Sequence, residues 1–262
     1  MNSPCRFRLL NTGFHNCYYN MALDEALLES TASLSAGERS GAGPALRLYG
    51  WSPPAVSVGY FQGLTEEVDL EACGRRGFDT VRRISGGGAV LHKSELTYSI
   101  IMPQDHPLLR GDLRDSYRVL CGGIISGLER LGVRAVFAGI NDILAGGRKI
   151  SGNAQTRRLG CLLQHGTVLL DNDVDVMFEV LKVPAEKTRG TLIREVKDRV
   201  TNLRSVLSRE VSFEEAAAAL SSGFAGALNL EYGGTEILPW EEERAQTLAA
   251  EKFSSREWLY KR

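Results

Sequence analysis

Residues 82–92 read Arg82-Arg83-Ile84-Ser85-Gly86-Gly87-Gly88-Ala89-Val90-Leu91-His92, and this stretch carries the strongest structural signal in the chain. It places three consecutive glycines between two strand-like runs. Such glycines let the backbone approach a ligand closely and aim several N–H groups at one point. No Gly-Lys-Ser/Thr ending follows, so the stretch is not a P-loop. It predicts either a bend that binds an anion, which the two arginines would neutralise, or a hairpin turn with two surface arginines.

The segments on both sides of this bend predict a sheet with helices against it. We expect strands at 45–49, 55–61, 80–83, 89–92 and 96–102, with connections too short for parallel crossovers. Apolar spacing and capping residues predict helices at 20–30, 114–131, 174–181, 213–228 and 240–253. A hairpin from 141–144 to 148–151 and a strand at 160–170 complete an α+β fold with a largely antiparallel sheet.

Length and composition narrow the class of protein. The 262 residues are expected to form one catalytic domain (1–262), with a core at about 9–207 and a helical C-terminal flank at 208–262. The formal net charge of -1 argues against nucleic-acid binding, which needs a broad basic face. Neither a membrane-spanning run nor a signal peptide is evident, so we expect a cytoplasmic protein. Five widely spaced cysteines suggest neither a disulfide framework nor a zinc site.

Two further segments contain candidate functional residues. In the hairpin, strand alternation sends Lys149 to the opposite face from Arg148, and an inward ammonium is costly unless an anion lies beside it. Lys149 is therefore either a polarising group for a phosphate or activated carbonyl, or an edge-strand lysine that discourages aggregation. His165 stands between apolar residues in the strand at 160–170, where a lone histidine is more often structural than catalytic.

These three segments, in this order, resemble the biotin/lipoate protein-ligase family, and most closely its lipoate–protein ligase branch. The correspondence also includes residues 20–26, 59–62 and 181–187, and it extends over about 9–207. Any single segment would be weak evidence, whereas the joint match is specific. The resemblance implies a mixed, mostly antiparallel sheet flanked by helices, similar to class II aminoacyl-tRNA synthetases and biotin ligases.

The resemblance also implies an activity. Such ligases use ATP and Mg²⁺ to convert lipoate into lipoyl-adenylate, with no tightly bound prosthetic group. They then transfer the lipoyl group to a lysine of a lipoyl domain in 2-oxoacid dehydrogenases, or to the H-type protein of the glycine cleavage system. Transfer from adenylate, which is a good leaving group, needs no enzyme nucleophile. Positioning and fixed positive charge would then supply catalysis.

The family pattern assigns roles to residues of this chain. Lys149 matches the catalytic lysine that touches the acyl carbonyl and the phosphate. Asn141 and Asp142 fall where adenine and phosphate–metal contacts are made, and Asp142 is the candidate magnesium ligand. The remaining residues implied to bind substrate or adenylate are Arg83, Ser85, Gly86, Gly87, Gly88, Ala89, His92, Gly152, Ala154, His165, Gly166 and Thr167.

The chain departs from the family pattern in two places. Where the motif usually continues His-Asp, this sequence has His92-Lys93, which puts any role for a carboxylate at 93 in doubt. About 55 residues follow Leu207, which is too few for the accessory C-terminal domain of many lipoate ligases. The resemblance is therefore stronger to short ligases that depend on a separate small accessory protein.

Two alternatives remain open. An octanoyl transferase of the same fold family would move octanoyl from acyl carrier protein to the lipoyl domain without ATP. Such enzymes capture the acyl group on a cysteine thiolate. Neither 137–140 nor 183–186 contains a cysteine where those enzymes have one, and Cys161 lies in an apolar strand. The other alternative is a non-catalytic module that binds lipoyl domains, although the intact lysine and glycine bend argue against lost catalysis. Biotin ligation is disfavoured because the motifs match the lipoate branch.

Overall fold

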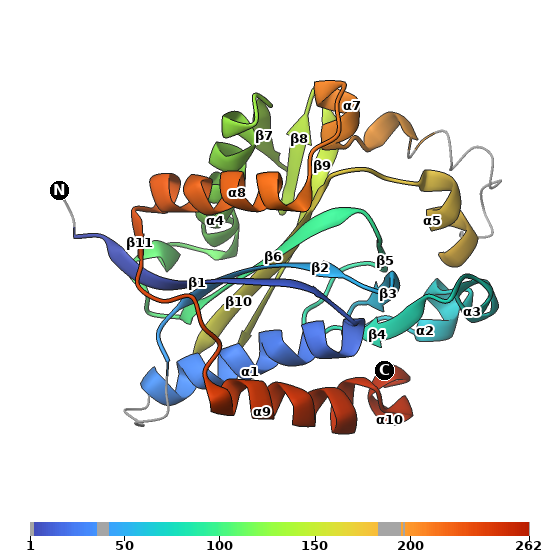
Figure 1. Ribbon diagram of the computed structural model, residues 1–262, viewed down its shortest axis with the longest axis horizontal. Helices are drawn as coiled ribbons and strands as arrows, with labels where there is room; N and C mark the ends of the chain where they lie inside the picture. Colours follow the sequence, from blue (N-terminus) through green and yellow to red (C-terminus); the bar gives the residue numbers. More distant parts are fainter. Residues whose placement is uncertain (1–2, 36–41, 183–194, 196, 262) are drawn as a thin grey trace.

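The computed structural model describes residues 3–35, 42–182, 195 and 197–261. Its centre is an eight-stranded sheet with the order β11-β1-β2-β6-β10-β9-β8-β7 (Figure 1). The strands are β1 (Cys5–His15), β2 (Ala45–Trp51), β6 (Glu95–Pro103), β7 (Ala135–Ala138), β8 (Asp142–Ala145), β9 (Arg148–Arg158), β10 (Cys161–Leu169) and β11 (Leu230–Tyr232). Strands β11, β1 and β2 pair in parallel, and the others pair antiparallel.

A second, three-stranded sheet has the order β4-β3-β5 and carries the glycine bend. Its strands are β3 (Ala55–Val58), β4 (Asp79–Arg82) and β5 (Val90–His92). The expectation of antiparallel pairing was wrong for β3 and β4, which are parallel. Two short helices, α2 (Leu64–Glu67) and α3 (Leu70–Arg76), form the crossover between them. Neither helix was expected, because both are too short to show a helical period.

Helices cover both faces of the large sheet (Figure 1). On one face α4 (Leu113–Arg130) packs against α8 (Phe213–Leu228), and the two backbones come so close that a Cβ at Gly223 would lie 2.2 Å from the amide nitrogen of Gly127. On the other face lie α1 (Cys17–Ser35) and α9 (Pro239–Leu248). Because side chains alternate along each strand, Leu46 belongs to the first core and its neighbour Ala45 to the second.

Shorter helices border these layers. They are η1 (Pro107–Leu109), α5 (Val174–Val180), α7 (Leu203–Leu207), η2 (Ala249–Phe253) and α10 (Arg256–Leu259). The predicted α+β class is confirmed, with a mostly antiparallel large sheet between helices. Strands β1, β7 and β11 were not expected. Of the motif at 181–187, residues 183–187 lie outside the described residues.

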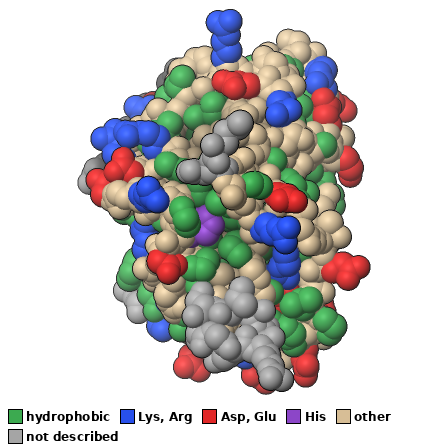
Figure 2. Space-filling model, turned by 90° about the vertical axis from the view of Figure 1, so that its left-hand side faces the viewer, with side chains coloured by type: hydrophobic (Ala, Val, Ile, Leu, Met, Phe, Trp, Pro, Cys, Tyr) green, Lys and Arg blue, Asp and Glu red, His purple; other side chains and the backbone are tan. Residues whose placement is uncertain are grey.

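The surface agrees with the near-zero net charge. On the face shown in Figure 2, Lys and Arg side chains lie among Asp and Glu side chains, and neither sign covers a broad area. Within the described ranges, no helix is both long enough and apolar enough to cross a membrane.

Candidate active site

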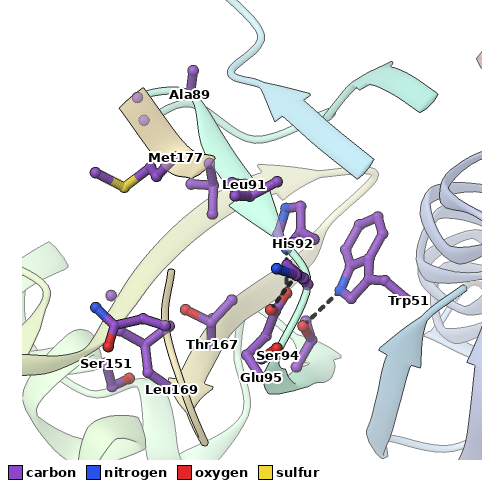
Figure 3. A pocket seen from close by; sticks show the side chains of 18 of the residues that line it. Trp51, Ala89, Leu91, His92, Ser94, Glu95, Ser151, Thr167, Leu169 and Met177 are labelled. Carbon is purple, nitrogen blue, oxygen red and sulfur yellow. Dashed lines mark hydrogen bonds and ion pairs between the residues drawn. The ribbon is translucent and has the colours of Figure 1, made fainter. Parts of the chain in front are cut away.

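A cavity of about 420 Å³ lies between the glycine bend, strands β5, β9 and β10, and helix α5. Figure 3 shows Met177, Leu91 and Ala89 on one side of it and Ser151, Thr167 and Leu169 on the other. The predicted site residues that line it are Arg83, Gly87, Gly88, Ala89, His92, Asn141, Lys149, Gly152, Ala154, His165, Gly166 and Thr167. Ser85, Gly86 and Asp142 do not line it, but each contacts a residue that does.

Arg83 sets the shape of the glycine bend. Its buried guanidinium donates hydrogen bonds to the carbonyls of Gly86 (3.2 Å) and Gly88 (2.9 Å), and to the carbonyl and hydroxyl of Ser57. Gly87 has a φ of 98°, which favours glycine, and its carbonyl oxygen would lie 2.1 Å from a Cβ at Gly59. Burial lowers the pKa of Arg83 to about 10, so the group stays protonated at neutral pH. Arg83 therefore places a positive charge behind the bend.

Arg82 points away from the cavity, so the expectation that both arginines neutralise a bound anion was wrong for this residue. Its fully buried guanidinium donates to the carbonyls of Gly59, Tyr60 and Gln62, and to the carbonyl of Leu259 at 2.8 Å. Strand alternation separates the two guanidiniums. Arg82 thus ties the loop beside the bend to helix α10.

His92 belongs to a buried chain that supports Arg83. Its Nε2 lies 2.6 Å from Ser57 Oγ, and its Nδ1 lies 2.7 Å from Glu95 Oε1. The imidazole stacks on Trp51 with 3.8 Å between ring centroids (Figure 3). Burial lowers the pKa of His92, although the Glu95 carboxylate partly opposes this shift. Because both ring nitrogens have partners, the imidazole fixes the wall of the cavity.

His165 belongs to a second buried chain on the opposite side of the bend. Its Nε2 lies 2.6 Å from Ser85 Oγ, and its Nδ1 lies 3.2 Å from Asp24 Oδ2. Asp24 also accepts hydrogen bonds from Arg47 and Ser99, both at 2.8 Å. Burial alone would raise the pKa of Asp24, but its contacts with His165 and Arg47 lower it overall. His165 is therefore a hydrogen-bonded structural residue that also lines the cavity.

Lys149 reaches the cavity from the β8–β9 hairpin. Its Nζ lies 2.6 Å from Asp142 Oδ1, and its side chain is 41% exposed. It extends over Gly152, where a Cβ would lie 2.8 Å from the ammonium nitrogen. Lys149 and the glycines Gly87 and Gly88 of the bend line the same cavity. The anion beside it in the structure is the Asp142 carboxylate.

Asn141 precedes this ion pair and is held to strand β9. Its side-chain amide donates to the carbonyl of Asn153, and the side-chain amide of Asn153 returns a 2.8 Å bond to the carbonyl of Asn141. The phenol of Tyr98 donates to Asn153 at 2.7 Å. These bonds fix the turn that positions Asp142.

The five cysteines all lie in the described ranges, and none of them lines this cavity. Cys161 is fully buried in strand β10, as its apolar neighbours predicted. Burial raises the pKa of Cys121 to about 12 and that of Cys73 to about 11. These thiols are protonated at neutral pH and lack the thiolate character of a nucleophile.

Sequence reasoning missed Ser57, Asp24 and Glu95 as parts of the site. For Asp24 there was a signal: it stands among apolar residues of a helix, where a carboxylate requires a buried partner. Ser57 and Glu95 had no comparable signal, because a single polar residue in a strand also fits an exposed position.

Comparison with known proteins places the chain in a family. Residues 16–225 match the lipoyl protein ligase A/B catalytic domain. The octanoyltransferase LipM of Kyrpidia tusciae is 38% identical over 98% of this chain and 99% of that protein. The LipM of Geobacillus kaustophilus is 37% identical over 98% of each chain.

Comparison with solved structures points to the same family. A bi-partite lipoate protein ligase from Thermoplasma acidophilum, described with its E2 lipoyl domain, has a TM-score of 0.86 and 31% identity over 98% of this chain and 97% of that one. A lipoate-protein ligase A bound with ATP has a TM-score of 0.81 and 30% identity over 98% and 99%. The fold is that of the lipoyl-attachment enzymes. The chain belongs to the lipoyl protein ligase A/B family.

Proposed function

We propose that this protein is a lipoate–protein ligase, which activates lipoate with ATP and transfers the lipoyl group from lipoyl-adenylate to a lysine of a lipoyl domain. The observation that carries the proposal is the composition of the cavity. It combines an apolar interior, a glycine bend backed by Arg83 and a half-exposed Lys149, while all five cysteines lie elsewhere. Such a site suits chemistry without an enzyme thiol.

Lys149 would polarise the acyl carbonyl and balance the charge of the adenylate phosphate. The amides of Gly87 and Gly88 donate no hydrogen bond to another described residue and lie at the cavity wall, where an oxyanion can accept from them. Asp142, which pairs with the ammonium at 2.6 Å, would be replaced by a phosphate as the closer anion when substrate binds. Apolar side chains such as Leu91, Leu169 and Met177 would bury the acyl chain.

The residues present fit ATP and Mg²⁺ as co-substrate and metal. Magnesium usually binds one or two protein carboxylates together with substrate phosphates and water. Asp142 offers one carboxylate beside Lys149 and Asn141, which agrees with an ion that arrives with the nucleotide. We propose Asp142 as that ligand and the surroundings of Asn141 as the adenine side of the site.

The partners would be a lipoyl domain, or the H-type protein of glycine cleavage, as the acceptor. One solved relative is described as a bi-partite lipoate protein ligase together with its E2 lipoyl domain. We therefore also propose that this chain activates lipoate poorly unless a separate small accessory protein is added. Efficient pyrophosphate release by the purified chain alone would contradict that requirement.

The second candidate is octanoyl transfer from acyl carrier protein, and a specific observation favours it. The curated relatives that match nearly the whole chain at 37–38% identity carry the name octanoyltransferase. With no cysteine at the cavity, such transfer would require direct attack of the acceptor amine on the thioester. Lys149 and the glycine amides could stabilise the oxyanion of that step as well.

One experiment separates the two candidates. The purified protein is mixed with a lipoyl domain and given either lipoate with ATP and Mg²⁺, with and without an accessory protein, or octanoyl-acyl carrier protein without ATP. Mass spectrometry of the acceptor then identifies the donor. A variant that combines Cys121→Ser and Cys161→Ser is the control, and we expect it to retain activity. A covalent octanoyl-thioester on the wild-type enzyme would overturn the ligase proposal, and modification in neither tube would overturn both.

A further inference from the structure

A second cavity, of about 510 Å³, adjoins the first and shares seven lining residues with it, namely Lys93, Ser94, Asp171, Asn172, Asp173, Val174 and Val200. Apart from Val174 and Val200, the side chains that line it are polar or charged. The mechanism proposed above leaves this cavity without a role, because Lys149 and the glycine bend face the first one.

The start of strand β9 separates the two cavities. Arg148 lines the second cavity and Lys149 lines the first, as expected for consecutive residues of a strand. The backbone amide of Thr201 donates a 2.8 Å hydrogen bond to the carbonyl of Lys149, and Val200 forms a parallel bridge with Lys149. A ligand in the second cavity would therefore contact the backbone that positions Lys149.

Among the described residues, the ion pairs around the second cavity leave Arg148 without a partner. Asp171 pairs with Arg204 at 3.1 Å, and Asp175 pairs with Lys197 at 3.0 Å. Asp173 pairs with Lys93 at 3.2 Å. Arg148 has no carboxylate within ion-pair distance among the described residues. Among the described residues that line the cavity, three cations and three carboxylates balance, and the guanidinium of Arg148 is the cation available to a bound anion.

Thr201 supplies a second, independent observation. The residue is 2% exposed and lines the second cavity, yet its Oγ1 has no hydrogen-bond partner in the described part of the chain. A buried hydroxyl without a partner is destabilising, so such groups are usually bonded. A ligand oxygen in this cavity would satisfy the hydroxyl and would also face Arg148.

We propose that the second cavity is an anion site, formed by Arg148 and Thr201, that binds a phosphate group of the acyl donor. The assignment to the acyl donor rests on the function proposed above, whereas anion binding itself does not. The phosphate has two possible sources, the pyrophosphate part of ATP or the phosphodiester of a carrier protein's prosthetic arm. In both cases the phosphate lies across β9 from the acyl group.

The anion site is tested first by calorimetric titration of inorganic pyrophosphate into the wild-type protein and three variants. We expect Arg148→Gln and Thr201→Val each to weaken binding about tenfold, because each removes a hydrogen bond to a charged ligand. Arg75→Gln, at an exposed arginine of α3, should bind like the wild type. Thr201→Val should unfold at an equal or higher temperature without ligand, because it removes an unsatisfied buried hydroxyl.

Steady-state kinetics then identify the source of the phosphate. If ATP supplies it, Arg148→Gln raises the KM for ATP and leaves transfer from preformed lipoyl-adenylate unchanged. If a carrier protein supplies it, Arg148→Gln raises the KM for octanoyl-carrier protein but not for octanoyl-N-acetylcysteamine, which lacks a phosphate. Pyrophosphate that binds Arg148→Gln as tightly as the wild type, or that fails to bind the wild type at millimolar concentration, would overturn the site. An Arg148→Gln effect on the acceptor KM alone would overturn it in favour of an entry for the acceptor lysine.

Discussion

The glycine bend and the β8–β9 hairpin face each other across one cavity, but they are held in different ways. The bend rests on buried ionisable groups with several partners each: Arg83, His92 and His165 are at most 6% exposed. The hairpin presents Lys149, whose side chain is 41% exposed and whose ammonium has one ion-pair partner, Asp142, within the described part of the chain.

This difference separates two requirements of acyl transfer. Hydrogen-bond donors for a developing oxyanion must be fixed before the substrate arrives, and buried networks achieve that rigidity. A charged group that contacts carbonyl and phosphate in turn benefits from a shallow position, which keeps its ammonium hydrated and able to move. Changes at the hairpin should therefore affect catalysis, whereas changes beneath the bend should affect folding.

The largest effect is expected for Lys149→Ala. Removal of the ammonium should lower both adenylate formation and transfer by about a thousandfold, because fixed charge at the reacting group supplies stabilisation of that order. The side chain is half-exposed, so the free energy of unfolding should change little.

Pyrophosphate release and transfer from preformed lipoyl-adenylate measure the two steps, with urea denaturation as the test of folding. Arg148→Ala, one residue away on the other side of the strand, is the matched control and should retain transfer from preformed adenylate. Near-full transfer by Lys149→Ala would remove this residue from the mechanism.

Arg83→Met should give the next largest effect, this time on stability. It leaves the carbonyls of Gly86 and Gly88 and the hydroxyl of Ser57 without their donor, at a cost of about 3 kcal/mol in the free energy of unfolding. Urea denaturation measures this loss. Arg75→Met on the surface is the control, and an equally small effect of both variants would show that the bend does not depend on Arg83.

Much of the fold was predictable where the pattern is local. The predicted helices at 114–131 and 213–228 correspond closely to α4 and α8, because apolar spacing and caps mark both. Strand β11 has only three residues, and β1 pairs in parallel with strands that follow it in the chain after long connections. Neither feature leaves a hairpin signal, so these strands were not evident in the sequence.

The candidate site, too, was predictable where the sequence pattern is local and not where distant residues meet. Lys149 and the glycine bend could both be identified as candidate segments, because each carries an unusual residue pattern, and the two line one cavity. The contact between Asp24 and His165 joins residues 141 positions apart, and no local pattern encodes it. Nor could alternation reveal that Arg82 binds the carbonyls of α10, since that contact depends on where the end of the chain packs.

A smaller effect is expected for Asp142→Asn, which probes the ion pair between Asp142 and Lys149. The amide oxygen can still accept a hydrogen bond, but the charge that holds the ammonium at the mouth is lost. We expect kcat to fall about tenfold with little change in stability, because the side chain is 36% exposed. If Asp142 also binds magnesium, raising the Mg²⁺ concentration should partly restore the rate. A rate equal to that of the wild type would show that the ion pair is incidental.

The smallest effect is expected for the pH dependence of stability that His92, beside the glycine bend, contributes. Burial lowers the pKa of His92 below its ordinary value of 6.5, so in this region the unfolded chain binds a proton that the native state does not. Stability should therefore fall as the pH drops below 6.5, by at most about 1.4 kcal/mol per pH unit for this group. His15 and His106, whose pKa values burial also lowers, act in the same direction, whereas Asp24 contributes only below 3.8. Urea denaturation between pH 7 and pH 5 measures how the free energy of unfolding changes with pH, and this change should be smaller for His92→Gln and unchanged for the control Lys93→Gln. If His92→Gln showed the same pH dependence as the wild type, the imidazole would titrate alike in the folded and unfolded states. The bend would then lack the rigid support inferred for it.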